Sequence, residues 1–415
     1  MHIVIIGNSA AGLSALEAFR KYDKKSSVTL ISKEGGIAYS RVLLPYYLRG
    51  KIDHDTFFIR DEEFYKKMNV NYIESCVVDI DEDSKVVKLD DDKSVSYDKL
   101  LITTGSSAVK PPIPGLDNEG VYNMWTLDDA HKIEPLFKEG KKVLVLGSGF
   151  VSLQAAWAAL YKGLDVKIIE LAPRIMPRVL DEKGSSILHN RIIELGADLR
   201  VNTLTEKIEK KEDGTFVVHT KGEDPFEVDL IIVGTGVRPN TQFLKGTSIE
   251  VDRGILVDET MKTNIEGIYA AGDVAQGLTT FGEKHVIHAL WPTAVEMGKI
   301  AGANMAGKEL EYQGSLNMNV TEMFKITVAS MGRFNDGEGD KVWVYEDEKT
   351  GGYMKVIYEN DLVVGATVVG SSDMVPFLGK LRPIIRKKIK AECSPDKLAS
   401  YLQIKAAKAT AKIEL

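Results

Sequence analysis

One pattern occurs twice in this 415-residue chain: an apolar segment, a glycine turn, a helical stretch and a second apolar segment. In the first copy the apolar segment is 2–6, the turn is 7–12, the helix runs to about residue 22, and the second apolar segment is 28–31. In the second copy these are 142–146, 147–152, a helix to about residue 161, and 166–169. Strands that alternate with helices at this spacing predict βαβ units of parallel sheets. We therefore expect an α/β fold built around two such units.

Three interruptions fall outside the two copies. Proline fixes its own φ and disfavours helix at the preceding residue, so Pro111-Pro112-Ile113-Pro114-Gly115 predicts an extended linker. Gly-containing junctions follow at residues 234–240 and 306–308. Beyond residue 311 the pattern predicts antiparallel strands with glycine turns, at residues 326–329, 342–345, 353–358 and 362–369. We expect residues 383–415, including the Ala/Lys-rich stretch 404–413, to be helical.

Charge and cysteine content exclude several classes of protein. The formal net charge is −7, which argues against a general nucleic-acid binder. No apolar stretch approaches the ~20 residues that cross a bilayer, and we expect no signal peptide. The two cysteines, Cys76 and Cys393, exclude a disulfide framework and a cysteine-rich metal or iron–sulfur site. We expect a cytoplasmic protein without a metal, in which Cys76 is a small buried hydrophobe.

The first glycine turn suits a pyrophosphate. A diphosphate needs a tight turn without an intruding Cβ and a helix N-terminus that points at it, and Gly7-x-Ser9-x-x-Gly12 supplies most of this. A strand–helix turn without a ligand is the alternative. Two later segments favour the ligand: Leu100–Gly105 is an apolar strand ending in Thr-Gly, and residues 263–273 end in Gly272-Asp273. A carboxylate there can accept a hydrogen bond from a ribityl hydroxyl.

The second turn, Gly147-x-Gly149-x-x-Ser152, is followed about twenty residues later by Glu170. An acid at that distance binds the 2′-hydroxyl of an adenosine ribose and repels a 2′-phosphate, so we expect NAD(H) in preference to NADP(H). Arg174 and Arg178 count against this preference, since an arginine can accommodate the phosphate. The alternative for Glu170 is an ordinary solvated acid at a strand end.

The order of these motifs resembles that of the pyridine-nucleotide-disulfide oxidoreductase superfamily, the two-dinucleotide flavoproteins, over residues 1–310. The resemblance implies two Rossmann-like domains, with the NAD domain inserted in the FAD domain, and a small α+β C-terminal domain. The FAD residues that it implies are Gly7, Ser9, Ala11, Gly12, Ser32, Glu34, Arg41, Thr104, Gly105, Gly272, Asp273 and Trp291. The implied NAD residues are Gly147, Gly149, Phe150, Val151, Gln154, Glu170 and Gly236.

The same resemblance divides the chain into four segments. We predict the first part of an FAD-binding domain at residues 1–110 and an NAD-binding domain at 111–238. The second part of the FAD domain follows at 239–310. Residues 311–415 form a C-terminal interface domain with a basic helical tail, through which the chain forms homo- or hetero-oligomers.

Four positions depart from the family pattern or leave a choice open. Where relatives have an acid for the FAD ribose, this chain has Ser32-Lys33-Glu34, and either Ser32 or Glu34 takes that role. Val42 stands at the place of the single redox cysteine, before Leu43-Leu44-Pro45-Tyr46-Tyr47. Gln154 replaces a glutamate that lies near the nicotinamide in relatives. Trp291 opens the helix that the resemblance places against the flavin, and the alternative for this residue is ordinary core packing. The resemblance implies that Arg41 contacts FAD, and the alternative is a surface arginine in a loop.

Without a redox cysteine, no residue beyond the flavin is expected to be catalytic, because thiolate chemistry needs a thiol beside the flavin. The sequence is then similar to NADH:rubredoxin and ferredoxin reductases and to NAD-linked FAD subunits of larger enzymes. The resemblance implies electron transfer between NAD(H) and a protein partner, in either direction, with the acid-free basic segment Lys380–Lys390 as a docking site. A solvated helix face is the alternative for that segment. Other functions left open are a stand-alone NADH oxidase, a CoA-disulfide-type reductase and an NADH-sensing signalling flavoprotein.

Overall fold

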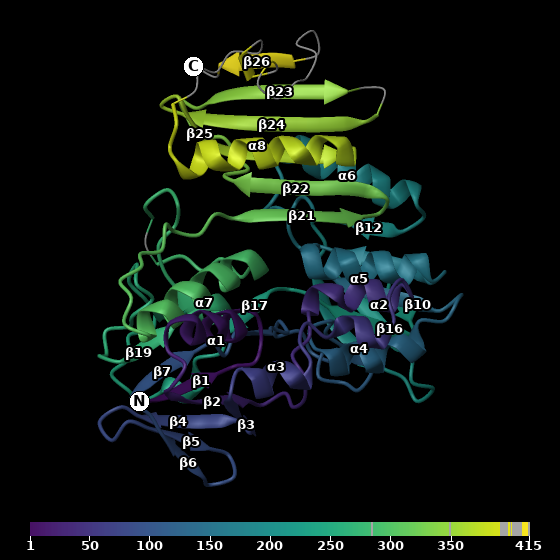
Figure 1. Ribbon diagram of the computed structural model, residues 1–415. Helices are drawn as coiled ribbons and strands as arrows, with labels where there is room; N and C mark the ends of the chain where they lie inside the picture. Colours follow the sequence, from purple (N-terminus) through teal and green to yellow (C-terminus); the bar gives the residue numbers. More distant parts are fainter. Residues whose placement is uncertain (284, 348–349, 391–396, 399, 401–408, 414–415) are drawn as a thin grey trace. The chain divides into compact units, whose positions relative to one another are not determined.

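The structure is a computed structural model that describes all residues except 284, 348–349, 391–396, 399, 401–408 and 414–415 (Figure 1). The chain forms two compact units. The first combines Met1–Ser40, Asp55–Ser107 and Val237–Leu316. The second combines Arg41–His54, Ala108–Gly236 and Asn317–Leu415. The domain boundaries expected at residues 110, 238 and 310 stay predictions.

The first unit is built on a parallel sheet whose described strands follow the order β19-β7-β1-β2-β3. The bounds are β1 (His2–Ile6), β2 (Ser27–Ser32), β3 (Val70–Glu74), β7 (Lys99–Ile102) and β19 (Ile268–Ala270). Every pair is parallel, as the first copy of the sequence pattern predicts. The strands β1, β7 and β19 are almost continuously apolar, as is typical of parallel strands whose two faces are both covered. Smaller elements complete the unit: β4 (Val77–Asp81), β5 (Val86–Leu89), β6 (Ser94–Ser96), β8 (Ser106–Ala108), β17 (Val237–Pro239), β18 (Ile255–Leu256), β20 (Ala275–Gln276) and α3 (Glu62–Lys67).

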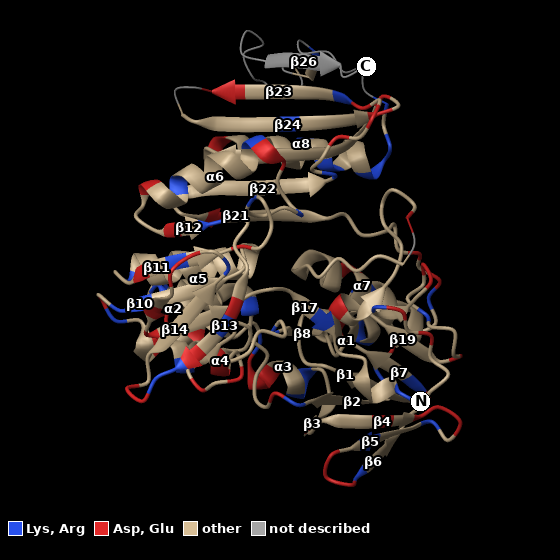
Figure 2. Cartoon of the chain, turned by 180° about the vertical axis from the view of Figure 1, so that it is seen from behind, with Lys and Arg blue, Asp and Glu red and all other residues tan. Residues whose placement is uncertain are grey.

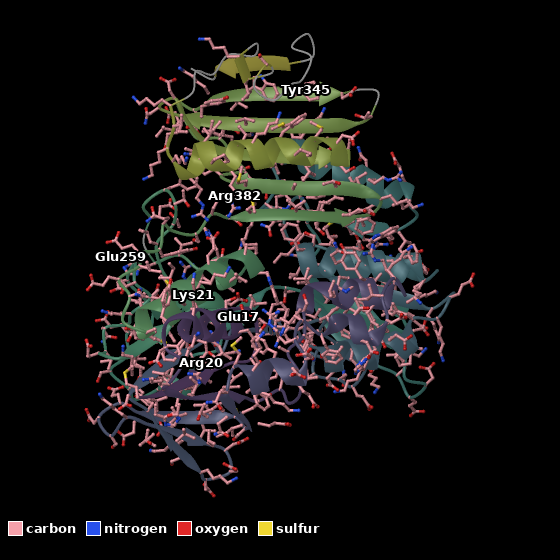
Figure 3. The ribbon with its side chains drawn as sticks, viewed as in Figure 1. Glu17, Arg20, Lys21, Glu259, Tyr345 and Arg382 are labelled. Atoms are coloured by element: carbon pink, nitrogen blue, oxygen red, sulfur yellow. The ribbon has the colours of Figure 1, made fainter. Side chains whose placement is uncertain are left out.

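Two helices of this unit, α1 (Ala10–Tyr22) and α7 (Trp291–Met305), lie side by side (Figure 1). Their contact is close because glycines of α7 face the backbone of α1. A Cβ on Gly298 would stand 2.3 Å from the Ala11 carbonyl oxygen, and one on Gly302 would stand 2.1 Å from that of Ala15. Arg20, labelled in Figure 3, anchors the end of α1 by donating to the carbonyl of Met68 at 2.7 Å.

The second unit contains another parallel sheet, with the order β12-β11-β10-β16-β9 among the described strands. Its strands are β9 (Val121–Tyr122), β10 (Lys142–Leu146), β11 (Asp165–Ile169), β12 (Asp198–Arg200) and β16 (Leu230–Val233). Its helices are α2 (Leu44–Leu48), α4 (Leu127–Ile133), α5 (Phe150–Tyr161) and α6 (Glu182–Glu194). An antiparallel ladder of β13 (Thr205–Lys210), β14 (Phe216–Thr220) and β15 (Phe226–Val228) accompanies them. The second copy of the sequence pattern is therefore also a βαβ unit.

The C-terminal part of the second unit is an antiparallel sheet, ordered β21-β22-β25-β24-β23-β26, that packs with α8. The bounds are β21 (Met318–Met323), β22 (Ile326–Gly332), β23 (Lys341–Asp347), β24 (Gly352–Glu359), β25 (Leu362–Gly370), β26 (Ala409–Ile413) and α8 (Val375–Arg386). The α/β fold with a small α+β C-terminal domain is confirmed. Among the described residues, no helix has the length and apolar character needed to cross a membrane.

Two expectations were wrong. Of the helix expected over 383–415, residues 383–386 are the end of α8, whereas Ala409–Ile413 is a strand that pairs with β23. Residues 391–396, 399, 401–408 and 414–415 of that stretch lie outside the described residues. Pairing with an open sheet edge overrides the modest helix preference of five residues that include Thr410 and Ile413. Cys76 is half-buried in the connection between β3 and β4, where its N–H donates to Asp90 at 3.1 Å. It is therefore not a core residue, and Cys393 lies outside the described residues.

Candidate dinucleotide-binding sites

The predicted FAD residues of the first unit gather at one edge of its sheet. Gly7 follows β1, Ser32 ends β2, Thr104 follows β7, and Asp273 follows β19. The register places Ile6 beside both Ile31 and Ile102, so these strands end level with one another. Ligands of open parallel sheets bind at this carboxyl edge.

The N-terminus of α1 is open toward that edge. Its first internal hydrogen bond runs from the Leu13 N–H to the Ser9 carbonyl at 2.9 Å, so the amides of residues 10–12 precede the intrahelical bonds. Ser9 makes no side-chain cap, and the first turn contains no acid. Exposed donors at the positive end of a helix suit an anion such as a pyrophosphate.

Two glycines make this turn as tight as it is. Gly7 has a φ of +118°, and a Cβ there would stand 2.2 Å from the Thr103 carbonyl oxygen. A Cβ on Gly12 would stand 2.0 Å from the Gly7 oxygen. Packing therefore requires glycine at both positions, with or without a ligand. Ala11 is buried, and its neighbours are Gly272 and Gly298.

Thr104 and Gly105 are held by a residue that the sequence analysis did not single out. Asn240 donates to the Thr104 carbonyl at 2.8 Å, and the Thr104 hydroxyl donates to the Asn240 carbonyl at 2.9 Å. The Asn240 N–H also donates to the Gly105 carbonyl at 3.0 Å. Gly105 has a φ of +66°, with no atom within 4 Å of its missing Cβ. The Asn240 position follows a proline at a domain junction, which was its only sequence signal.

The Gly272-Asp273 turn packs against the helix pair. A Cβ on Gly272, which has a φ of +80°, would stand 3.0 Å from the Ala11 Cβ. The Asp273 carboxylate accepts a hydrogen bond from the Ser106 hydroxyl at 2.9 Å. A carboxylate accepts several hydrogen bonds, so this contact is compatible with the ribityl contact of Asp273, which stays a prediction.

The choice between Ser32 and Glu34 is not settled by their contacts. The Ser32 hydroxyl donates to the Glu34 carbonyl at 2.9 Å, and the Glu34 carboxylate accepts from the Tyr39 hydroxyl at 2.5 Å. Tyr72, which also donates to the Glu34 carbonyl, has a raised pKa chiefly because it is buried. Both candidates therefore lie in one hydrogen-bonded segment, Ser32 at the end of β2 and Glu34 in the loop that follows it.

Helix α7 also presents an open N-terminus. Its first turn contains Pro292 and no acid, and no side chain caps it. Trp291 is half-buried and packs against the apolar core of the first unit, so core packing is part of its role. Its contact with the flavin stays a prediction.

The turn after β10 repeats this construction in the second unit. Helix α5 begins behind Gly149, which has φ −75° and ψ 180° and does not cap it with a side chain. Gly147 has a φ of +97°, and a Cβ there would stand 2.7 Å from the Gly234 oxygen. Ser152, at the third glycine position, is fully buried and donates to that same Gly234 oxygen at 2.6 Å. The extra hydroxyl thus fixes the helix to the end of β16.

Glu170 bends over the glycine turn from the end of β11. One carboxylate oxygen accepts from the buried Ser148 hydroxyl at 2.6 Å, and the other accepts from the Ala172 N–H at 2.7 Å. Arg174 donates to the Leu180 carbonyl at 3.2 Å, within its own loop. Ser148, which lies between the two glycines of the turn, thus holds Glu170 in place, and no sequence signal indicated this role.

Gln154 connects α5 to the C-terminal sheet. Its Nε2 donates to the Thr321 hydroxyl at 2.6 Å and to the Glu322 carbonyl at 2.9 Å. Its Oε1 is buried and has no hydrogen-bond partner within the described part of the chain. Phe150 and Val151, half-buried, form the first turn of the same helix, and Gly236 lies after β16 with a φ of +120°.

The segment expected to hold the reacting centre has no thiol. Arg41 and Val42 lie in a short 3₁₀ turn of residues 41–43, and the Val42 side chain is 57% exposed. The Arg41 guanidinium lies 5.5 Å from the centre of the Trp125 ring and donates to the Trp125 carbonyl at 3.3 Å. The contact of Arg41 with FAD stays a prediction. In the described part of the chain, Cys76 is a free cysteine.

The two sheets, each with a glycine turn and an open helix N-terminus at its carboxyl edge, define an α/β protein with two dinucleotide sites. Residues 1–298 match the family model described as pyridine nucleotide-disulphide oxidoreductase, and residues 318–389 match that of the rubredoxin NAD+ reductase C-terminal domain. The chain belongs to the pyridine nucleotide-disulphide oxidoreductase family. It is an oxidoreductase that uses FAD and NAD(H), as the sequence resemblance implied.

Similar proteins differ in their acceptors. The chain is 32% identical to the NADH-dependent phenylglyoxylate dehydrogenase subunit epsilon of Aromatoleum evansii, over 86% of this chain and 85% of that protein. It is 30% identical to an NADH oxidase of Methanocaldococcus jannaschii, over 94% of this chain and 92% of the other. The solved structure of an NAD-dependent persulfide reductase from A. fulgidus has a TM-score of 0.87 and 28% identity, covering 96% of this chain and 79% of that one.

Proposed function

We propose that this chain transfers electrons between NAD(H) and a protein electron carrier through a bound FAD. The observation that carries the proposal is the combination of two pyrophosphate-type turns with Val42 at the position of the redox thiol. Bound FAD exchanges a hydride with the nicotinamide and exchanges single electrons with one-electron carriers. The residues of the chain bind and orient the two nucleotides, and no side chain is assigned a covalent role.

The contacts of Glu170 support NADH over NADPH. Its carboxylate is held over the turn by Ser148, where it can accept a hydrogen bond from a ribose 2′-hydroxyl and repel a 2′-phosphate. Arg174 points its guanidinium into its own loop, toward the Leu180 carbonyl. We expect Glu170→Ala to lower kcat/KM for NADH by about 10-fold or more, because a hydrogen bond to a charged group contributes ~1.5–3 kcal/mol. A kcat/KM that is higher for NADPH than for NADH in the native chain would contradict this preference.

The C-terminal match supports a protein acceptor. Residues 318–389 match the C-terminal domain of rubredoxin NAD+ reductase, and the Aromatoleum relative is a subunit of a larger dehydrogenase. The acceptor is thus an iron-containing carrier such as rubredoxin or ferredoxin, or a sister iron–sulfur subunit. The electrons flow toward NAD+ in the second case.

The basic segment Lys380–Lys390 is the docking site in this proposal. Lys387, Lys388 and Lys390 follow α8 and are exposed. Figure 2 shows the lysines and arginines of the chain in blue. Arg382, labelled in Figure 3, lies on α8 itself. Exposed cations next to one another attract an acidic carrier and raise its association rate. We also propose that the chain is cytoplasmic and that it forms an oligomer through its C-terminal domain.

The first test is an anaerobic titration of the purified FAD protein with NADH, followed by flavin absorbance. We expect two electrons per FAD to complete the reduction. Uptake of four electrons with a thiolate–flavin charge-transfer band would make Cys76 or Cys393 redox-active and would overturn the proposal in favour of disulfide chemistry.

A second test identifies the acceptor. The NADH-reduced protein is mixed with rubredoxin, with ferredoxin or with oxygen, and the rate of flavin reoxidation is compared. Lys387→Glu should slow reoxidation by an acidic carrier several-fold at low ionic strength, whereas Lys138→Glu, an exposed lysine elsewhere in the same unit, should not. Oxygen as the fastest acceptor would favour the NADH oxidase alternative, which the Methanocaldococcus relative represents.

A further inference from the structure

Helix α5 is fixed at two points near its N-terminus. Both points are buried polar side chains on a helix that is otherwise mostly apolar. Ser152 bonds to the Gly234 carbonyl at 2.6 Å, which ties the helix to its own sheet. Gln154 bonds to Thr321 and Glu322 of β21, which ties the same helix to the C-terminal sheet.

The Glu322 carbonyl determines which way the Gln154 amide faces. A carbonyl oxygen only accepts, so the group 2.9 Å from it must be the Nε2 donor and not the Oε1 acceptor. The Thr321 hydroxyl, 2.6 Å away, then receives the second Nε2 hydrogen. A glutamate, the residue expected here from the resemblance, would place a carboxylate oxygen against the carbonyl. The glutamine at position 154 therefore supplies the N–H donors that the two acceptor oxygens of β21 require.

The adenosine end of the site is held independently of β21. Glu170 is fixed by Ser148 and by the Ala172 N–H, and the start of α5 by Ser152. None of these contacts involves the C-terminal sheet. The Gln154 tie is thus a polar contact between β21 and the part of α5 that lies beyond the pyrophosphate turn, one turn before Trp157, whose ring lies 5.5 Å from that of Phe324.

We propose that Thr321 is a positioning residue for hydride transfer, which acts by holding Gln154, and through it α5, in register with the nicotinamide end of the nucleotide. The inference rests on the proposed function and deepens it by naming a residue that affects the rate of flavin reduction without changing the affinity for the adenosine half.

The test compares three variants of the full-length FAD protein. Thr321→Val keeps the shape of the side chain and removes the hydroxyl, Thr321→Ser keeps the hydroxyl, and Val320→Thr alters the neighbouring residue, which is 51% exposed. For Thr321→Val we expect the rate constant of flavin reduction at saturating NADH to fall about 3- to 10-fold, the range for loss of one hydrogen bond. The Kd of ADP-ribose should stay within about twofold. The other two variants should reduce at the native rate.

Two further readouts separate positioning from loss of structure. Amide hydrogen exchange of residues 153–158 should be faster in Thr321→Val, while the melting temperature falls by only a few degrees. In a Gln154→Met background, where both bonds are already absent, Thr321→Val should have no further effect.

The outcomes distinguish this inference from the proposed function. If NADH does not reduce the native flavoprotein, the proposed function fails. If the native protein is reduced but Thr321→Val is reduced equally fast, or the Kd of ADP-ribose rises in parallel with the rate loss, the positioning role of Thr321 is refuted alone.

Discussion

The α1–α7 contact gives a sharp prediction for Gly302→Ala. An added Cβ would stand 2.1 Å from the Ala15 carbonyl oxygen, whereas ordinary contact begins at 3.4 Å. The atoms that it meets belong to the backbone, so two helices must shift and no side chain can rotate away. Overpacking costs up to about 3 kcal/mol, and alanine regains about 1 kcal/mol over glycine inside a helix. We expect a net loss of about 2 kcal/mol, or about 4–8 °C in the melting temperature of a domain of this size.

Gly379→Ala in α8 is the matched control. Nothing lies within 4 Å of its missing Cβ, so only the helix preference remains and the variant should be stabilised by up to about 1 kcal/mol. The assay is thermal unfolding followed by circular dichroism, together with release of bound FAD, since α1 carries the first glycine turn. Gly302→Ala should release FAD at the lower temperature. The packing argument is refuted if Gly302→Ala unfolds at or above the native temperature while Gly379→Ala is stabilised.

Three other changes test separate parts of the chain. Gly149→Ala should leave the melting temperature within about 2 °C but raise the Kd of NADH about 10-fold or more, because the space beside this glycine is needed only by a pyrophosphate; an unchanged Kd, measured by titration, would contradict this. Burial lowers the pKa of His288 from 6.5, so below pH 6.5 the unfolded chain binds a proton more readily than the folded one and stability is lost as the pH falls. His288→Gln should therefore reduce the fall in melting temperature below pH 6.5. His285→Gln, at an exposed histidine, should not. Lys355→Met leaves the Asp181 carboxylate without the ammonium that lies 3.3 Å from it, and we expect the free energy of unfolding to fall by about 3–5 kcal/mol. A melting temperature equal to that of the native protein would contradict this.

Local pattern was sufficient to predict the two sheets and the position of both glycine turns at the carboxyl edge, where ligands of such sheets bind. Runs such as residues 3–6 and 143–146 are apolar throughout, as strands buried on both faces must be. Each leads into a glycine turn, and parallel strands bring such turns to the same edge. The positions of Glu170 and Asp273 at strand ends follow from that geometry alone.

Contacts between distant parts of the chain could not be predicted in the same way. Asn240 lies 136 residues from Thr104, and Gln154 lies 167 residues from Thr321. No local property of an asparagine or a glutamine indicates its partner at such a separation. The helix predicted at Ala409–Ile413 was wrong for the same reason, because the conformation of this segment depends on its pairing with β23 and not on its own residues.

Glycine identity alone does not distinguish a position required by packing from one required by a ligand, but the surroundings of each glycine do. Gly12 and Gly302 meet backbone carbonyl oxygens at 2.0 and 2.1 Å, so the fold excludes a side chain there whether or not a nucleotide binds. Gly149 differs from both. Its φ of −75° suits any residue, and the structure leaves open space beside it. A glycine with neither a steric nor a conformational reason, at the N-terminus of a helix above a parallel sheet, is explained by the close approach of a phosphate. The second dinucleotide site therefore rests on a position that the fold itself does not need.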